Sequence, residues 1–378
     1  MTTPVTFASP IAPASYTWEA TDEEVAARYG VAIADIVRFD LNTSPTPPAL
    51  AARILASGRF VTPLSEYPPS DYRELVEAAA ARYGVDTNEL LVGAGADEIL
   101  DIVAKTFLVA GDTAVVPAPT YAMFRVLTEQ RGAVADLVPR LAHDGWRADS
   151  PAVREAARVA RVVWLCSPNN PTGLAEPDGS IATLLAGLAA DARDEGREPP
   201  IVVLDEAYAE FVGASLASLR HGHPNLVVVR TVSKAYALAG LRVGFAIARP
   251  ETIARMAPYR PPGSVSTASV TVVTAALRDD TIAAENVARV TSERGRLIDA
   301  LRGAGWQVGP SATNFVLVGF GSAERSGIVA EGLLRRGLVP RTFPSGHPLA
   351  AYLRLTVRDA AGNDRLIDAA RAIEQDVR

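Results

Sequence analysis

Short apolar runs alternate with helix-like segments along most of the chain, and this order most constrains the possible fold. Five such runs lie at Thr113–Val116, Val162–Cys166, Ile201–Leu204, Leu226–Val229 and Val243–Ala248. The fourth run is rich in β-branched residues, as expected of a strand that is buried on both faces. Helical segments separate most of the runs. The sequence therefore predicts an α/β fold, in which helices cover both faces of a largely parallel sheet.

Two helical segments carry signals at both of their ends. The segment "TDEEVAARYG" begins with Thr21 and Glu24 in the spacing of a capping box. The segment "DYRELVEAAAARYG" repeats this spacing with Asp71 and Glu74, and both segments end in glycine. A third helix is predicted for "ADEILDIVAKTFLVAG".

The pattern changes after about residue 263. One long helical stretch, from about Thr267 to Leu301, precedes short strands near Asn314–Val318 and Tyr352–Val357. We therefore expect a second, smaller α/β domain. The predicted divisions are an N-terminal arm at 1–40 that joins the small domain, a large domain at 41–262 and the small domain at 263–378.

Composition narrows the classes of protein to which the chain can belong. Its 378 residues, 48% of them hydrophobic, suffice for a large core, and a net charge of −6 does not favour a nucleic-acid partner. No apolar run approaches the roughly 20 residues that span a membrane. No Lys or Arg precedes Arg28, so we expect no signal peptide. With Cys166 as the single cysteine, a cytoplasmic protein is the simplest expectation.

Polar side chains follow three of the predicted strands. Asn169 and Asn170 come after Val162–Cys166, in "SPNNPTG", whereas Asp205 and Tyr208 follow the next strand in "DEAY". Lys234 follows Leu226–Val229 in "RTVSK". Because ligands bind beyond the carboxyl ends of parallel strands, we expect these groups to share one site.

A separate small-residue turn, "GAGADE" at Gly93–Glu98, leads into a predicted helix. Free backbone amides and the positive end of a helix make such a turn a candidate phosphate seat. Arg242 and the hydroxyl groups of Thr231 and Ser233 are candidates to complete this seat.

Each feature also has a simpler explanation. Asp97 suits the first turn of any helix, and an aspartate such as Asp205 after a strand is often a helix cap. Lys234 alone would suit a solvated loop, and Cys166 suits a core position. Because these polar groups follow successive predicted strands in one chain, a shared chemical role is favoured over separate local explanations.

The chemistry that needs this set of groups is that of pyridoxal 5'-phosphate. A lysine amine bonds the cofactor aldehyde, for which Lys234 is the candidate. A carboxylate keeps the pyridine nitrogen protonated, for which Asp205 is the candidate. Tyr208 and Asn170 are placed to hydrogen-bond the ring oxygen O3′, and no metal site is expected.

The sequence also resembles a known family, the fold-type I aminotransferases, and within it the histidinol-phosphate aminotransferase group. The resemblance runs from "FDLNTSP" to "LRLTV" and includes "PAPTYAMF", "VVLDEAYAEF", "RTVSKAYALAGLRVGF" and "ATNFVLV". It implies a large domain with a mostly parallel, seven-stranded sheet and a smaller α/β C-terminal domain.

The resemblance also implies a role for each matching residue. Lys234, Asp205 and Tyr208 would be catalytic, with Lys234 as the Schiff-base lysine and proton carrier. The residues implied to bind the cofactor are Lys234, Asp205, Tyr208, Asn170, Tyr121, Gly95, Ala96, Asp97, Thr231, Ser233, Arg242 and Tyr67. In this set Tyr121 would stack on the ring, and Tyr67 would reach the cofactor phosphate of a partner subunit. That role implies a homodimer.

Two arginines are implied to bind substrate, together with Asn170. Arg354 matches the arginine that binds the substrate's anionic group in the family. The alternative is that Arg354 is an ordinary surface arginine without a binding role. Arg341 lies thirteen residues before it, and this spacing matches a pair that faces the substrate phosphate. The alternative for Arg341 is a solvated loop arginine.

The implied reaction is transamination, from histidinol phosphate or an aromatic amino acid to 2-oxoglutarate. The segment "LNTSPTPPAL" departs from the family at Thr43, Ser44 and Thr46, which leaves the amino donor open. A threonine-phosphate decarboxylase would use the same cofactor groups. A third alternative, a cofactor-binding regulatory domain, would need a DNA-binding domain, for which about 40 residues before the core leave little room.

Overall fold

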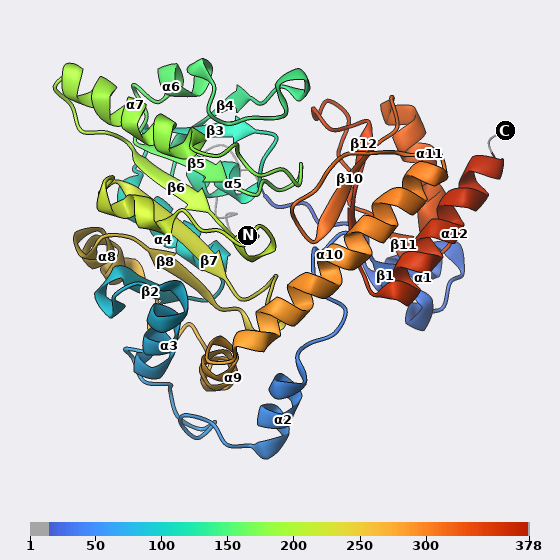
Figure 1. Cartoon of the computed structure of the whole chain (residues 1–378), viewed down its shortest axis with the longest axis horizontal. Helices are drawn as coiled ribbons and strands as arrows, with labels where there is room; N and C mark the ends of the chain where they lie inside the picture. The colour runs from blue at the N-terminus through green and yellow to red at the C-terminus, as the bar shows by residue number, and fades with distance from the viewer. Residues whose placement is uncertain (1–14, 377–378) are drawn as a thin grey trace, which may run out of the picture.

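A seven-stranded sheet forms the centre of the larger of two bodies (Figure 1). The structure is a computed structural model that describes residues 15–376, so residues 1–14 of the predicted N-terminal arm lie outside the described residues. The sheet order is β2 (Leu90–Gly93), β8 (Gly244–Ile247), β7 (Leu226–Thr231), β6 (Ile201–Asp205), β5 (Val162–Cys166), β3 (Thr113–Ala118) and β4 (Val134–Pro139). The five strands from β7 to β4 are parallel, and β8 pairs antiparallel with both β7 and β2. The predicted mostly parallel sheet is confirmed.

Both faces of the central strands are buried, as the apolar runs predict. Along β5, Val163 and Leu165 join one hydrophobic cluster, whereas Val162 and Trp164 join the other. This alternation follows from the two-residue repeat of a strand, which sends neighbouring side chains to opposite faces.

Helices cover each face of the sheet. One face packs against α4 (Ala96–Phe107), α5 (Met123–Gln130) and α8 (Pro250–Met256). The other face packs against α3 (Arg73–Tyr83), α6 (Pro151–Ala156), α7 (Ser180–Asp194) and α9 (Thr267–Leu277). A further helix, α2 (Ala49–Ser57), contacts α9.

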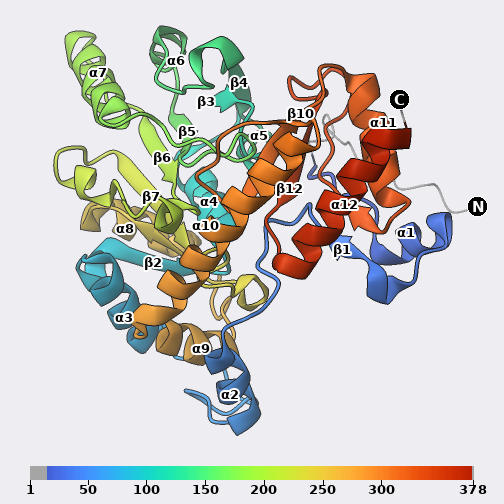
Figure 2. The same cartoon turned by 45° about the vertical axis from the view of Figure 1, so that its right-hand side comes forward.

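The smaller body contains the C-terminal part of the chain and the start of the described chain (Figure 2). Its elements are α1 (Asp22–Tyr29), β1 (Val37–Arg38), β9 (Gln307–Val308), β10 (Phe315–Gly319), α11 (Ala323–Leu334), β11 (Leu338–Val339), β12 (Tyr352–Thr356) and α12 (Ala360–Asp376). Strand β10 lies between β12 and β9, and β1 pairs with β11. Within residues 15–376, no helix is both long and apolar enough to cross a membrane.

Helix α10 (Asp280–Gly303) runs from beside α9 to the small sheet, as both views show (Figures 1 and 2). The sequence predicted one helical stretch here, but the structure divides it into α9 and α10. The break forms because Asp279 caps α10, its Oδ1 accepting a hydrogen bond from the Thr281 amide at 2.9 Å. The domain boundary at residue 263 stays a prediction, and α9 packs on α2 and α3.

Of the two capping boxes predicted at helix starts, one forms and the other does not. The capping box of Thr21 and Glu24 forms at the start of α1. The predicted box of Asp71 and Glu74 is wrong, because Tyr72 becomes the N-cap of α3 in a left-handed conformation (φ 48°). Its ring is buried, and its hydroxyl group accepts a hydrogen bond from the Val265 amide. Tertiary packing of the ring therefore overrides the local capping signal.

Candidate active site

The carboxyl ends of β5, β6 and β7 meet at one edge of the large sheet. The register pairs Cys166 with Asp205 and Asp205 with Val229, so β5 and β6 end level with one another and β7 runs two residues further. The segments "SPNNPTG", "DEAY" and "TVSK" therefore leave the sheet side by side, as their order predicts.

Lys234 lies three residues beyond β7 and points its amine into the protein. Its Nζ donates to the main-chain oxygen of Asn42 at 3.2 Å and lies 5.8 Å from the centre of the Tyr208 ring. Burial disfavours the charged ammonium, and the Arg354 guanidinium repels it, so the pKa of Lys234 falls to about 8. About half of the amine is thus neutral near pH 8, the form that bonds a carbonyl carbon.

Asp205 is the last residue of β6, and it is only 4% exposed. Its Oδ1 accepts a hydrogen bond from the Ala207 amide at 2.9 Å. Burial raises the pKa of Asp205 to about 7, although the Ala207 hydrogen bond and the nearby Lys234 charge act against this rise. A buried carboxylate of this kind is stabilised by a cationic hydrogen-bond donor.

Tyr208 and Asn170 each accept a side-chain hydrogen bond from a buried residue. The Tyr208 hydroxyl group accepts a hydrogen bond from Asn42 Nδ2 at 3.0 Å, and burial raises the pKa of this phenol. Asn170 is buried, and its Oδ1 accepts from Arg354 Nη1 at 2.6 Å. This bond fixes which way the Asn170 amide group faces.

The turn before α4 packs so closely on its neighbours that it needs glycine. A Cβ on Gly95 would lie 2.6 Å from Nη2 of Arg242, and a Cβ on Gly244 would lie 2.5 Å from the carbonyl carbon of Gly95. Gly95 also has a positive φ of 86°. The Arg242 guanidinium therefore lies directly against the amino end of α4, where Ala96 begins the helix.

Hydroxyl groups and one carboxylate complete this corner. Thr231 Oγ1 donates to Ser233 Oγ at 2.9 Å. Asp97 Oδ2 lies 3.3 Å from Arg242 Nη2, and its Oδ1 accepts from the Tyr121 hydroxyl group at 2.7 Å. The predicted phosphate residues and Tyr121 are thus brought together.

Arg341 and Arg354 are cross-strand neighbours. Each donates its main-chain amide to the other's carbonyl oxygen at 3.1 Å, in an antiparallel bridge. Directly opposed residues in such a bridge send their side chains to the same face, with Cα atoms about 5.5 Å apart. The thirteen-residue spacing in the sequence therefore becomes direct adjacency.

The two side chains have different surroundings. Arg354 is buried, its Nη2 donates to the Asp40 carbonyl oxygen, and burial lowers its pKa. Arg341 Nη1 donates to the Thr17 carbonyl oxygen at 2.7 Å and lies 3.6 Å from Glu19 Oε1. Arg341 is therefore anchored by the N-terminal segment, not by solvent alone.

Tyr67 is not brought to the site within one chain. It lies between α2 and α3 and is 88% exposed. Within residues 15–376, no hydrogen bond to Tyr67 is present. Its predicted role stays open for a partner subunit.

The sequence reasoning missed Asn42 and Asn314. Asn42 contacts both Lys234 and Tyr208, and its backbone has a positive φ of 53°. Asn314 Nδ2 donates to the Asn42 carbonyl oxygen at 2.9 Å. Each asparagine stands inside a motif that carried the family resemblance, "FDLNTSP" for Asn42 and "ATNFVLV" for Asn314. Those motifs were the signals that could have identified the two residues, but no role was assigned to either.

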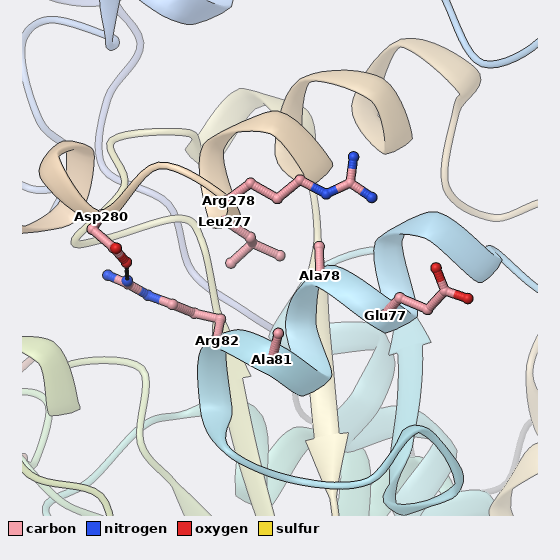
Figure 3. Close-up of a pocket in the computed structure, with 7 residues that line it drawn as sticks. All are labelled: Glu77, Ala78, Ala81, Arg82, Leu277, Arg278 and Asp280. Carbon is pink, nitrogen blue, oxygen red and sulfur yellow. Dashed lines mark hydrogen bonds and ion pairs between the residues drawn. The ribbon is translucent and has the colours of Figure 1, made fainter.

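A hollow of about 430 Å³ lies elsewhere, between α3 and the α9–α10 junction (Figure 3). Its lining includes Glu77, Leu277 and Arg278, and an ion pair joins Arg82 Nη1 to Asp280 Oδ1 at 2.5 Å. None of the predicted site residues lines this hollow, so we do not assign the candidate active site to it.

Comparison with known proteins agrees with this geometry. The family model described as aminotransferase class I and II matches residues 38–370. Histidinol-phosphate aminotransferase of Symbiobacterium thermophilum is 36% identical, over 89% of this chain and 90% of the relative. The enzyme of the same name from Thermococcus gammatolerans is 35% identical, over 89% and 92%.

The fold is also found among solved structures. Histidinol-phosphate aminotransferase from Sinorhizobium meliloti, solved in complex with pyridoxal-5'-phosphate, superposes with a TM-score of 0.85. The superposition covers 96% of each chain at 24% sequence identity. This likeness supports the two-body architecture of Figure 1.

Proposed function

Because the chain belongs to aminotransferase class I and II, we propose that it is a pyridoxal-phosphate-dependent histidinol-phosphate aminotransferase. It would transfer the amino group of histidinol phosphate to 2-oxoglutarate, in histidine biosynthesis in the cytoplasm. The observation that carries the proposal is that Lys234 and Asp205 lie at the ends of neighbouring strands, each with a shifted pKa. Burial gives this pair a lysine pKa of about 8 and an aspartate pKa of about 7.

The residues present fit pyridoxal phosphate. The tight turn at Gly95 places backbone amides beside the Arg242 guanidinium, which suits a phosphate group. Asp205 offers a buried carboxylate that would pair with a ring N–H⁺, and Lys234 offers an amine whose pKa is lowered to about 8. When bound, the cofactor supplies an aldehyde that bonds amines and a protonated ring that withdraws electrons from the substrate Cα.

Lys234 has two tasks in this mechanism. Its Nζ would hold the cofactor through the cofactor's aldehyde, and it would be free as an amine while a substrate amine is bound there instead. The free Nζ would be the group on this chain that accepts the substrate Cα proton and then gives it up again as an acid. The lowered pKa matters, because it leaves a larger neutral fraction of the amine near neutral pH than an ordinary lysine has, and only the neutral amine can accept this proton.

Asp205, Tyr208 and Asn170 would orient the ring and set its charge. The Asp205 carboxylate would hold a proton on the pyridine nitrogen. The Tyr208 hydroxyl group and the Asn170 amide would hydrogen-bond O3′, and Asn42 and Arg354 hold these two side chains in place. Tyr121 would lie against the ring, with its hydroxyl group tied to Asp97.

The adjacent arginines suit a phosphorylated amino donor. Two guanidinium groups can each donate paired hydrogen bonds to a phosphate dianion, whereas one suffices for a carboxylate. The cross-strand pairing of Arg341 with Arg354 supports this assignment. Transamination of 2-oxoglutarate would then use Arg354 for a carboxylate.

Arg341→Ala is expected to lose about 1.5–3 kcal/mol in kcat/KM with histidinol phosphate, the range of a charged hydrogen bond. With phenylalanine as donor the loss should be much smaller, because no phosphate is present. Steady-state kinetics with both donors measures the difference. Arg335→Ala, an exposed arginine on the surface next to α11, serves as the matched control. Equal losses with both donors would contradict a phosphate-specific role.

A homodimer would place Tyr67 at the partner's cofactor phosphate. Tyr67 is 88% exposed and Leu64, on the same segment, is 71% exposed, so a partner surface would bury apolar area here. This arrangement predicts that each site takes Lys234 from one subunit and Tyr67 from the other.

Co-expression of Lys234→Ala with Tyr67→Asp subunits is expected to restore activity, although each variant alone is inactive. In a hybrid dimer, one of the two sites has both native residues. Random pairing would therefore give about a quarter of the wild-type activity. Kinetics and size analysis of the purified mixture measure this. Full activity in a species of monomer size would show that the site is not shared.

The decarboxylase alternative differs only in which Cα bond breaks. A single-turnover screen separates the functions, by following the cofactor absorbance with histidinol phosphate, phenylalanine and threonine phosphate. The proposal expects the fastest amino transfer from histidinol phosphate. Carbon dioxide release from threonine phosphate, without an oxo-acid acceptor, would support the decarboxylase.

A further inference from the structure

Asn286 on α10 contacts the main chain that carries the reactive lysine. Its Nδ2 lies 2.9 Å from the carbonyl oxygen of Ala235 and 3.3 Å from that of Lys234. Its Oδ1 accepts a hydrogen bond from Arg289 Nη2 at 2.8 Å, which fixes the orientation of the amide. The amide donors therefore face the turn after β7.

The two ends of that turn are joined by a main-chain hydrogen bond, from the Leu238 amide to the Val232 carbonyl oxygen at 3.3 Å. Ala237 adopts a left-handed conformation (φ 56°), which non-glycine residues keep only when their surroundings impose it. Within the turn, the Ala237 amide reaches the Lys234 carbonyl oxygen at 3.2 Å. Asn286 supplies further hydrogen bonds to the same carbonyl and to the next one.

Asn286 also contacts the segment that holds the lysine side chain. Its Nδ2 lies 3.1 Å from Ser44 Oγ. Two residues earlier, the Asn42 carbonyl oxygen accepts the hydrogen bond from Lys234 Nζ. One side chain thus touches both the backbone of Lys234 and the short segment that carries the acceptor for its amine.

We propose that Asn286 is a positioning residue for Lys234, and that its amide and Ser44 hold the lysine turn against the segment Asn42–Ser44. The proposal rests on the proposed function, because it concerns the amine that performs the transfer. Since α10 spans both bodies, Asn286 also ties this turn to the helix that joins them (Figure 1).

Two substitutions test the role of the amide. Asn286→Ala removes the side chain, and Asn286→Leu keeps similar volume but donates no hydrogen bond. Both are expected to lower kcat roughly 10- to 100-fold, because a displaced base loses its alignment with the Cα proton. KM for the amino donor should stay within about 3-fold, since Arg354 and Arg341 are untouched. Ser44→Ala should have a smaller effect, and Glu285→Ala, an exposed neighbour on α10, is the control.

A second measurement does not depend on the reaction. After removal of the cofactor, acetylation of Lys234 is followed by mass spectrometry as a function of pH. In the wild type, half-maximal reactivity is expected near pH 8. In both Asn286 variants it should move upward toward the ordinary lysine range, because water reaches a loosened amine.

The outcomes are distinguishable. If Asn286→Leu keeps the kcat and the labelling profile of Glu285→Ala, the hydrogen bonds do not position Lys234, and the inference is wrong. A variant that only melts at lower temperature, with both readouts unchanged, would contradict the inference in the same way. A wild type without transaminase activity would instead overturn the proposed function, whereas the labelling comparison would still test the inference.

Discussion

Replacing Lys234 with alanine is expected to abolish turnover, with a loss in kcat of more than about 10⁴-fold. General acid–base catalysis alone contributes about 10²- to 10⁴-fold, and in the proposed function this amine would also bond the cofactor. The cofactor should still bind through the proposed phosphate seat at Gly95 and Arg242, because that seat would not use the lysine. Steady-state kinetics and cofactor absorbance measure the two effects separately.

The chain offers a matched control, because it has only two lysines. Lys105 pairs with Asp101 on α4 at 2.6 Å, and Lys105→Ala should retain activity. Borohydride reduction of the wild type should attach the cofactor to the peptide that contains Lys234. Attachment to Lys105 would contradict the assignment.

Replacing Asp205 with asparagine is expected to cost about 4 kcal/mol of transition-state stabilisation, or about 1,000-fold in rate. Without the carboxylate, a proton on the pyridine nitrogen would lack its partner in a buried site, and a neutral ring withdraws electrons poorly. Cofactor binding should suffer less than turnover.

Single-turnover kinetics with histidinol phosphate measures this loss in the Asp205 variant. Asp194→Asn, an exposed aspartate at the end of α7, provides the control for the same chemical change. A near wild-type rate in Asp205→Asn would mean that another group protonates the ring.

The central strands were predictable from short sequence windows. The run Val162–Cys166 became β5 with identical limits, because five successive buried positions leave no polar face to mislead the prediction. The edge strands β2 and β4 were not predicted. Most of β4 is exposed, so its sequence lacks the continuous apolar run of a central strand.

The chemical groups at the strand ends were predictable for a related reason. Lys234, Asp205 and Asn170 follow apolar runs directly, and parallel order brings the ends of such runs to one edge. Residues that complete the site from elsewhere were not predictable in this way. Asn42 lies 192 positions from Lys234, and no local pattern marks an acceptor at that distance.

The sequence by itself determined the sheet-forming runs, their order and the reactive groups after them, because strand burial and strand ends are local properties. Only the tertiary structure decided which distant residues touch those groups. It paired Arg341 with Arg354, and it set Asn286 against the turn of Lys234. It also set the pKa values of Lys234 and Asp205, since these depend on burial and on charges that the whole fold assembles.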